Sequence, residues 1–182
     1  MIKTDRLLLR PLAESDCPAI VAELNNFAIC KNLARVPFPY HLSDAAEFLT
    51  FARSLDQRSL VCAITLNPNP DTLIGIVSYE YSPEKSDAEL GYWLSENYWR
   101  KGIMSEAVNA IVDHAFTISK LETLVSCYHN DNPNSGRILK RIGFRLRDQS
   151  TNFSKAQGSI VPVTNMRFTR EMWHNQQKSR RD

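Results

Sequence analysis

Hydrophobic and polar positions in the first third of the chain follow a strand pattern and then helical patterns. Residues 5–12 form a short apolar run that predicts a strand. Ser15 and Asp16 are typical helix-start residues, and apolar positions at helical spacing follow them. Ser43 begins a second helical pattern. Between the two helices, residues 36–40 contain two prolines, which cannot continue a helix, so we expect a helix-loop-helix after the first strand.

The middle of the chain predicts an antiparallel meander followed by a strong helix. Strands are expected at Leu60 to Leu66, Leu73 to Tyr81 and Ala88 to Leu94, because turn-rich segments separate these runs. The clearest amphipathic pattern of the chain comes next, with apolar residues recurring every three or four positions. Its members are Met104, Ala107, Val108, Ile111, Val112 and Ala115.

The last third predicts a β-α-β crossover. A strand is expected at Thr123 to Tyr128, a helix from Pro133, another strand from Phe144 and a final strand at Val161 to Thr169. No internal repeat interrupts this order, so the elements predict a mixed sheet of the α/β class.

The composition predicts a single domain whose cysteines are reduced. The 182 residues, 43% of them hydrophobic, suit a single domain, expected over 1–175, with a polar tail at 176–182. The four cysteines show no metal-ligand spacing, so we expect neither disulfides nor a metal site. A net charge of +2 does not point to nucleic acid. Without a signal-peptide pattern or a membrane-spanning run, we expect a cytoplasmic protein.

Residues 98–107 (YWRKGIMSEA), the phosphate loop, lie between a predicted strand and the strongest helix. The first N–H groups of a helix lack internal partners and attract anions. Gly102 permits close backbone approach, and Arg100 and Lys101 add positive charge. The pattern is also typical of an ordinary turn with a solvated edge. It matches neither a nucleoside-triphosphate loop nor a dinucleotide loop.

Four segments in order resemble the GNAT superfamily of N-acetyltransferases, specifically the branch that acetylates the N-termini of ribosomal proteins. They are TDRLLLRPL, ELGYWLSENYWRKGIMSEA, NPNSGRILKRIGF and MRFTREMW. The resemblance implies a GNAT fold, α/β or α+β. Its twisted, mixed but mostly antiparallel sheet has about six or seven strands, about four flanking helices and a splayed central pair. It also implies acetyl-CoA as co-substrate, with no metal.

In that family the loop amides hold the pyrophosphate of CoA. The resemblance therefore assigns cofactor binding to Trp99, Arg100, Lys101, Gly102, Ile103, Met104 and Ser105. Trp99 replaces the usual Gln or Arg, and Met104 replaces a small residue. Because Met104 belongs to the apolar stripe, its side chain can enter the core while its N–H faces the phosphate.

The sequence NPNS predicts a helix start, with Asn132 as N-cap and Pro133 as the first helical residue. The resemblance adds that Asn132 contacts the pantetheine arm and that Ser135 lies near the thioester sulfur. There Ser135 would donate a proton or a hydrogen bond to the leaving thiolate. Tyr92 and Tyr128 are rival donors, although an aromatic residue in a strand is often part of the core.

The resemblance places a glutamate near the acyl site in the segment that carries Glu89, so we expect Glu89 to act as base, through water. It shares a strand face with Gly91 and Trp93. Alternatively, Glu89 pairs with a basic neighbour or faces solvent. His129 is the second candidate base, although a lone histidine at a strand end is often exposed.

The expected reaction is acetyl transfer to a primary amine, by direct attack in a ternary complex. A protein α-amino group, with a pKa of about 7.7–8.0, is more readily neutral than a lysine near 10.4. The alternatives are a small-molecule amine, such as a polyamine or antibiotic, and a non-catalytic CoA-binding regulatory domain. The segment 31–53, expected on the acceptor side, carries the basic residues Lys31, Arg35 and Arg53 against the acidic residues Asp44 and Glu47. This excess of basic residues argues slightly against a polycationic acceptor.

Two expectations concern partners other than the acceptor. Neither nucleic acid nor a membrane is expected to bind the chain. A homodimer stays open, with the final strand as a candidate for edge pairing.

Overall fold

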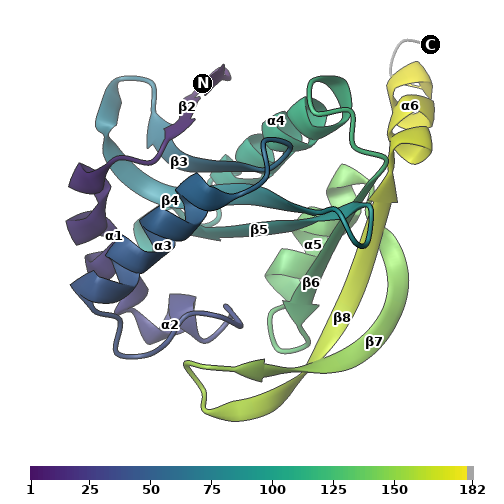
Figure 1. Cartoon of the computed structure of the whole chain (residues 1–182). Coiled ribbons are helices and arrows are strands. Elements are labelled where there is room, and N and C mark those ends of the chain that lie inside the picture. The colour runs from purple at the N-terminus through teal and green to yellow at the C-terminus, as the bar shows by residue number, and fades with distance from the viewer. Residues whose placement is uncertain (180–182) are drawn as a thin grey trace.

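The computed structural model describes residues 1–179, and within them one twisted sheet of eight strands forms the centre (Figure 1). The strands follow the order β1-β2-β3-β4-β5-β6-β8-β7 across the sheet. They are β1 (Ile2–Lys3), β2 (Leu7–Pro11), β3 (Leu60–Leu66), β4 (Asn69–Ser82), β5 (Asp87–Leu94), β6 (Thr123–His129), β7 (Arg145–Ser154) and β8 (Ser159–Thr169).

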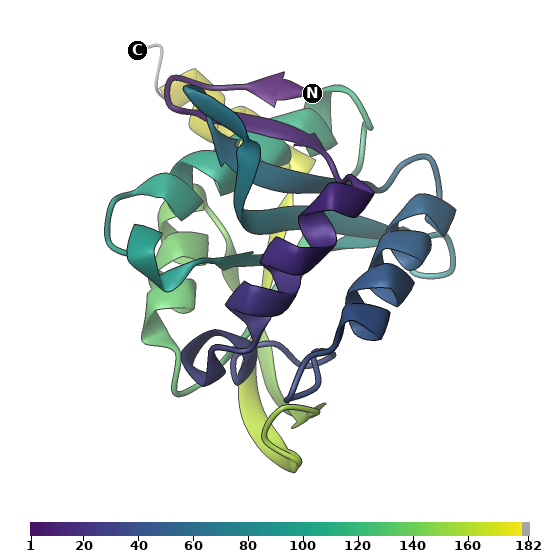
Figure 2. The ribbon, with the colours of Figure 1, turned by 90° about the vertical axis from the view of Figure 1, so that its left-hand side faces the viewer.

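Helices cover both faces of this sheet (Figure 2). The six are α1 (Cys17–Leu24), α2 (Phe27–Cys30), α3 (Leu42–Ser54), α4 (Ile103–Thr117), α5 (Pro133–Ile142) and α6 (Arg170–Ser179). Helices α1 and α3 share a core with Ala63 and Ile76, whereas α4 and α5 share the other core with Ile64 and Val77. Successive residues of β3 and β4 therefore serve opposite cores, as strand alternation requires.

The only parallel neighbours in the described sheet are β5 and β6, and their pairing is short. It covers Ala88 with Leu124 and Glu89 with Val125. One residue further on, the Ser126 hydroxyl donates to the carbonyl oxygen of Leu90 at 2.9 Å. Beyond that bond the strands diverge, which confirms the predicted splayed pair.

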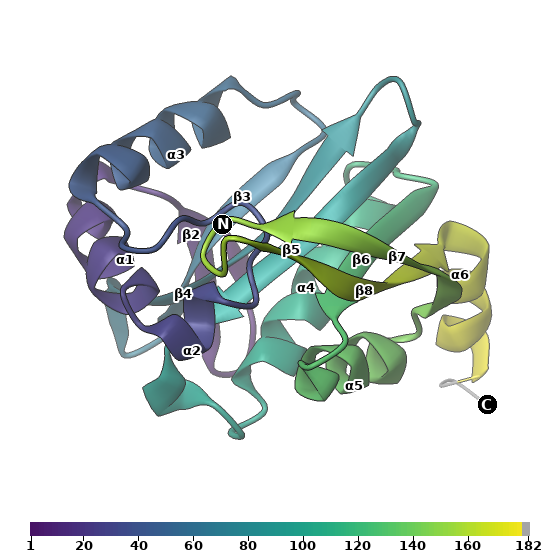
Figure 3. The same ribbon diagram turned by 90° about the horizontal axis from the view of Figure 1, so that it is seen from below.

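The far end of the split is bridged by the tip of the β7–β8 hairpin (Figure 3). The backbone N–H of Lys155 donates to the carbonyl of Ala34 at 3.1 Å. The Gln157 side-chain amide donates to the carbonyl of Lys31 at 2.8 Å. The hairpin is thereby held against the segment between α2 and α3.

Every helix and strand that the hydrophobic pattern predicts is present, but β1, α2 and α6 were not predicted. The structure accordingly has eight strands and six helices within residues 1–179, more than expected. Helix α6 escaped the pattern because only Met172 and Trp173 anchor it to the core. Trp173 also donates from its ring N–H to Asp113 at 2.7 Å. Residues 176–179 of the predicted tail continue α6, and 180–182 lie outside the described residues.

A buried ion pair fixes the start of α1 against β2. Asp16 is 2% exposed, and its two oxygens accept from Arg10 at 2.7 and 2.8 Å. Burial raises the pKa of Asp16, but hydrogen bonds from Arg10 and from the Ala13 N–H lower it further, so the net shift is downward. Asp16 therefore stabilises the fold above the ordinary carboxyl pKa, and this is lost as pH falls through the lower folded value.

Asp16→Ala should lower the free energy of unfolding by about 3 kcal/mol at pH 7, because Arg10 keeps an uncompensated charge. Urea titrations of both proteins would measure this, and their difference should shrink below about pH 4. As the control, Arg53→Ala breaks the exposed pair with Glu14 and should change stability by at most about 1 kcal/mol. A difference that stays constant down to pH 2 would contradict the assigned role of the ionised carboxylate.

Candidate functional site

A cavity of about 920 Å³ opens at the split between β5 and β6. Residues of β4, β5 and β6 line it, together with the first turns of α4 and α5 and the α1–α3 layer. It brings together all the predicted site residues except one: Glu89, Trp99, Arg100, Gly102, Ile103, Met104, Ser105, Asn132 and Ser135. The exception is Lys101.

The phosphate loop has an unusual backbone at the cavity wall. Gly102, the N-cap of α4, has φ +74°, and Arg100 has φ +60°. The left-handed conformation costs a residue with a side chain about 1–2 kcal/mol, so contacts around Arg100 must hold it. One such contact is Trp99, whose ring N–H donates to the Leu94 carbonyl at 2.7 Å.

The helix start that follows this loop presents free donors. Within residues 1–179, the backbone N–H groups of Ile103, Met104 and Ser105 have no hydrogen-bond partner. The Met104 side chain is 6% exposed and lies in the core, as expected. The first turn of α4 can therefore bind an anion through its backbone.

The side chain of Lys101 points away from the cavity. Its ammonium group donates to the Asn97 carbonyl at 2.8 Å and lies 5.5 Å from the Tyr98 ring centre, outside the cavity lining. The expectation that its charge faces an anion in the cavity is not met by this conformation.

Two arginines that the sequence reading missed line the same region. Arg137 and Arg141 on α5 are four residues apart, which places them on one helix face, and both border the cavity. The Arg137 guanidinium also donates to the Asn134 side chain at 2.9 Å. Their spacing after the NPNS motif was the signal that could have identified them.

Ser135 forms a hydroxyl pair with Tyr92. The predicted N-cap is present, because the Asn132 side chain accepts from the Ser135 N–H at 3.3 Å. The Ser135 hydroxyl in turn lies 2.9 Å from the Tyr92 hydroxyl. Burial raises the pKa of Tyr92 to about 12, although the contact with Ser135 opposes the shift. Both hydroxyls therefore carry protons at neutral pH and can donate them.

Tyr128, the other proposed donor, packs beneath α5. A Cβ atom on Gly136 would lie only 2.6 Å from the Tyr128 ring, so glycine lets the helix approach the strand closely. Tyr92 rather than Tyr128 is the tyrosine that contacts Ser135.

Glu89 occupies the last backbone pair before the split, on the opposite face of β5 from Tyr92. It is exposed and makes no hydrogen bond or ion pair with the part of the chain that the structure describes. The nearby Arg35 instead binds Glu80 with two hydrogen bonds of 2.7 and 2.9 Å. Glu80 is directly across from Glu89 on β4. Glu89 therefore presents an unpaired carboxylate at the cavity wall.

His129, the second candidate base, was expected to be exposed, but it is buried. It is 3% exposed, and its Nδ1 atom has no partner among residues 1–179. Burial lowers its pKa more than the nearby Asp131 raises it. The neutral imidazole forms part of the cavity wall.

The cavity wall opposite α4 and α5 is more acidic than the residue count of segment 31–53 indicated. Four carboxylates line it, which we call the acidic half: Asp44, Glu47, Glu80 and Glu89. Of the basic residues counted there, only Arg35 reaches the cavity, and it is bound to Glu80. Arg53 turns away to Glu14. Counting along the sequence missed the two glutamates on β4 and β5.

Two kinds of feature are absent from residues 1–179. No cluster of three or more metal-ligating side chains occurs there. No helix in that range is both long and apolar enough to cross a bilayer.

One protein family matches most of the chain. The family described as "Acetyltransferase (GNAT) domain" matches residues 6–145. A ribosomal-protein-serine acetyltransferase of Escherichia coli is 38% identical over 77 residues, covering 42% of this chain and 43% of that protein.

Two solved structures share the fold over almost the whole chain. A spermidine N-acetyltransferase of Vibrio cholerae, in complex with CoA and spermine, superposes with TM-score 0.80 at 20% identity, covering 93% of this chain and 99% of that one. RimL, a ribosomal L7/L12 alpha-N-protein acetyltransferase in complex with coenzyme A, gives 0.77 at 22%, covering 91% and 95%.

Proposed function

Because the chain belongs to the acetyltransferase (GNAT) family, we propose that it transfers acetyl from acetyl-CoA to a primary amine, a protein N-terminal α-amino group in particular. The observation that carries the proposal is the split between β5 and β6. It joins the free amides of α4 to the acidic half in one cavity. A cofactor and an amine can therefore meet there from opposite faces of the sheet.

On the cofactor side, the N–H groups of Ile103 to Ser105 would bind the pyrophosphate. Arg100, Arg137 and Arg141 add positive charge along the same wall. The backbone of Tyr92 points into the split, since it has the same parity as Leu90, which bonds across to β6. Pantetheine would pair with that exposed strand edge as an added strand does.

The chemistry needs one base and one acid. The neutral amine attacks the thioester carbonyl carbon, and the carbon–sulfur bond breaks as the amide forms. Glu89 accepts the amine proton through water. Ser135 gives its proton to the leaving thiolate and is reprotonated by Tyr92, whose hydroxyl lies 2.9 Å away. Tyr92 then regains a proton from solvent, to which Glu89 releases the proton it took from the amine. Both proton transfers then occur at groups that line the cavity.

The acceptor assignment rests on the relative that acts on ribosomal proteins and on the two segments that meet at one end of the cavity lining. The hairpin tip and the α2–α3 segment close one end of the cavity, which suits the slender end of a chain. The three carboxylates without an ion pair in the described residues favour a cationic acceptor, and they support a polyamine as the second candidate: Asp44, Glu47 and Glu89.

An acceptor panel separates these functions. We expect release of free CoA thiol, followed with a thiol reagent, when acetyl-CoA is mixed with peptides that have a free α-amino group. The same peptides with a blocked N-terminus and an intact lysine serve as the control and should react at least about tenfold more slowly, because the lysine is protonated.

The other outcomes of this panel decide between the alternatives. If spermidine is acetylated and none of the peptides is, the acceptor is a polyamine and the N-terminal assignment is wrong. CoA binding in calorimetry without turnover on any amine would support a non-catalytic domain.

A further inference from the structure

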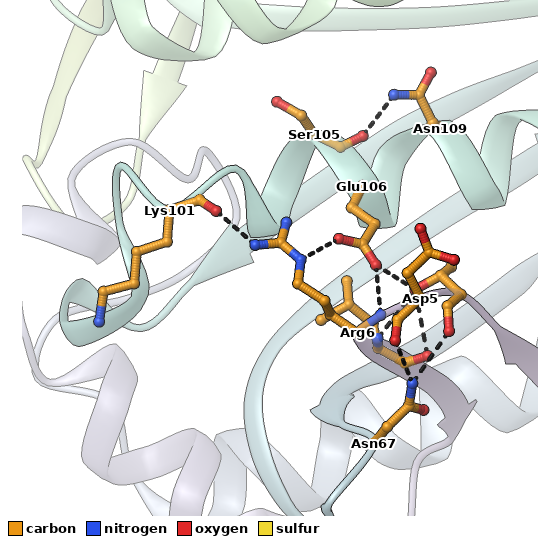
Figure 4. Close-up of polar contacts among 9 residues, drawn as sticks. Asp5, Arg6, Asn67, Lys101, Ser105, Glu106 and Asn109 are labelled. Atoms are coloured by element: carbon orange, nitrogen blue, oxygen red, sulfur yellow. Dashed lines mark hydrogen bonds and ion pairs between the residues drawn. The ribbon is translucent and has the colours of Figure 1, made fainter.

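The motif TDRLLLRPL, at the start of the chain, contributes a side chain to the phosphate loop across almost a hundred residues of sequence (Figure 4). Arg6, in the turn between β1 and β2, donates from Nη1 to the Lys101 carbonyl at 2.9 Å. Its Nε donates to Glu106 in the first turn of α4 at 2.6 Å. We propose that Arg6 is a positioning residue that holds the phosphate loop in its cofactor-binding conformation; this rests on the cofactor placement proposed above.

The carbonyl that Arg6 binds lies at the most constrained point of the loop. Lys101 stands between Arg100 and Gly102, the two residues with left-handed backbones. A side-chain-bearing residue such as Arg100 leaves that conformation readily unless its neighbours are fixed. A guanidinium bonded to the intervening carbonyl opposes that rearrangement. Arg6 therefore acts where the loop is least able to keep its own shape.

The same guanidinium also ties the loop to the helix that follows it. Glu106 accepts from the Thr4 hydroxyl at 2.6 Å, from the Arg6 N–H at 3.0 Å and from the Arg6 side chain. Burial raises the pKa of Glu106, but these hydrogen bonds lower it by more, so the carboxylate stays ionised at neutral pH. One planar side chain thus fixes the loop relative to the first turn of α4, whose amides face the cavity.

The turn that carries Arg6 is itself anchored. The Asn67 side chain donates to the carbonyls of Thr4 and Asp5, each at 3.1 Å, and its backbone N–H donates to the Arg6 carbonyl at 2.9 Å. Neither Arg6 nor Glu106 lines the cavity. Their contacts therefore reach the cavity through the loop, whereas Arg137 and Arg141 border it directly.

Arg6→Ala should weaken CoA binding about tenfold in calorimetry and raise KM for acetyl-CoA by a similar factor. KM for the acceptor should stay within about twofold. Arg6→Lys, which cannot make both bonds with one planar group, should recover less than half of the loss in binding free energy. Arg6→Ala combined with Glu106→Gln should bind CoA about as weakly as the worse single variant, because the two residues act as one unit.

Arg10→Ala is the matched control. Arg10 also lies near the start of the chain, but its hydrogen bonds go to the buried Asp16 and to the carbonyls of Pro11 and Pro70, not to the phosphate loop. It should lower the melting temperature while leaving KM for acetyl-CoA unchanged. If Arg10→Ala raises that KM as Arg6→Ala does, or if Arg6→Ala raises KM for both substrates equally, the positioning role is wrong and general destabilisation explains the result.

The proposed cofactor site and the Arg6 inference fail separately. Wild-type protein that does not bind CoA would overturn the cofactor placement. Wild-type protein that binds CoA, with Arg6→Ala binding equally well, would overturn the role of Arg6 alone.

Discussion

Ser135→Ala is expected to lower kcat by about 10²- to 10³-fold while leaving the dissociation constant of CoA within about twofold. The leaving thiolate loses its proton donor, and the Tyr92 hydroxyl is left without its 2.9 Å partner. The cofactor contacts assigned to the backbone of α4 are untouched. Stopped-flow measurement of thiol release, together with calorimetry for CoA, separates the two effects.

The chain contains a matched control for this hydroxyl pair. Ser119 and Tyr79 form a similar contact of 2.8 Å outside the cavity lining. Ser119→Ala should leave kcat within about twofold. Tyr92→Phe added to Ser135→Ala should cost little more than Ser135→Ala alone, because Tyr92 acts through the serine. A full rate in Ser135→Ala would remove the serine from the proposed mechanism, and a full rate in the double variant would remove both hydroxyls.

Glu89→Gln is expected to lower kcat by about 10²-fold with the α-amino acceptor, because the amine proton then has no carboxylate to receive it. Glu89 makes no ion pair with residues 1–179 that the substitution would break, so the melting temperature should change little. Steady-state rates against a series of peptides with less basic N-termini provide the measurement. The loss should shrink as the acceptor becomes less basic, since less of it is protonated.

Glu47→Gln tests whether Glu89 acts as a base or only adds negative charge to the cavity. Glu47 is another carboxylate of the acidic half, and it makes no hydrogen bond or ion pair with the described residues, so the substitution removes the same charge and frees no arginine. If Glu89 is the base, Glu47→Gln should change KM for the acceptor more than kcat. An equal fall of kcat in both variants would mean that the acidic half works by electrostatics alone.

Local patterns predicted most of the fold because each of those elements carries its own signal. The apolar stripe of α4 appears in full in the structure, and the turn-rich segments separate β3, β4 and β5 as expected. Helix α6 carries too little apolar surface to be recognised alone. Its contact with α4, the hydrogen bond from Trp173 to Asp113, joins residues that only the tertiary structure brings together.

The parts of the candidate site that are continuous in sequence were predictable, whereas the contacts between segments distant in sequence were not. The phosphate loop and the NPNS helix start are continuous motifs, and both border the cavity. The contact between Arg6 and Lys101 joins two motifs that are distant in sequence, and neither motif contains a pattern that predicts the contact. The orientation of Lys101 and the burial of His129 depend on neighbours that spacing cannot reveal.

The short pairing of β5 with β6 also bears on how the domain holds together. Two residue pairs and the Ser126 hydrogen bond are the direct links between these strands across the centre of the sheet. A cofactor lying in the split would bind to both sides at once and complete the missing part of the sheet. Part of its binding free energy then becomes cohesion of the protein itself, growing with the logarithm of cofactor concentration above the dissociation constant. The strands on both sides already share one buried core with α4 and α5, so the empty domain stays folded, and the loaded domain should resist unfolding more strongly than the empty one.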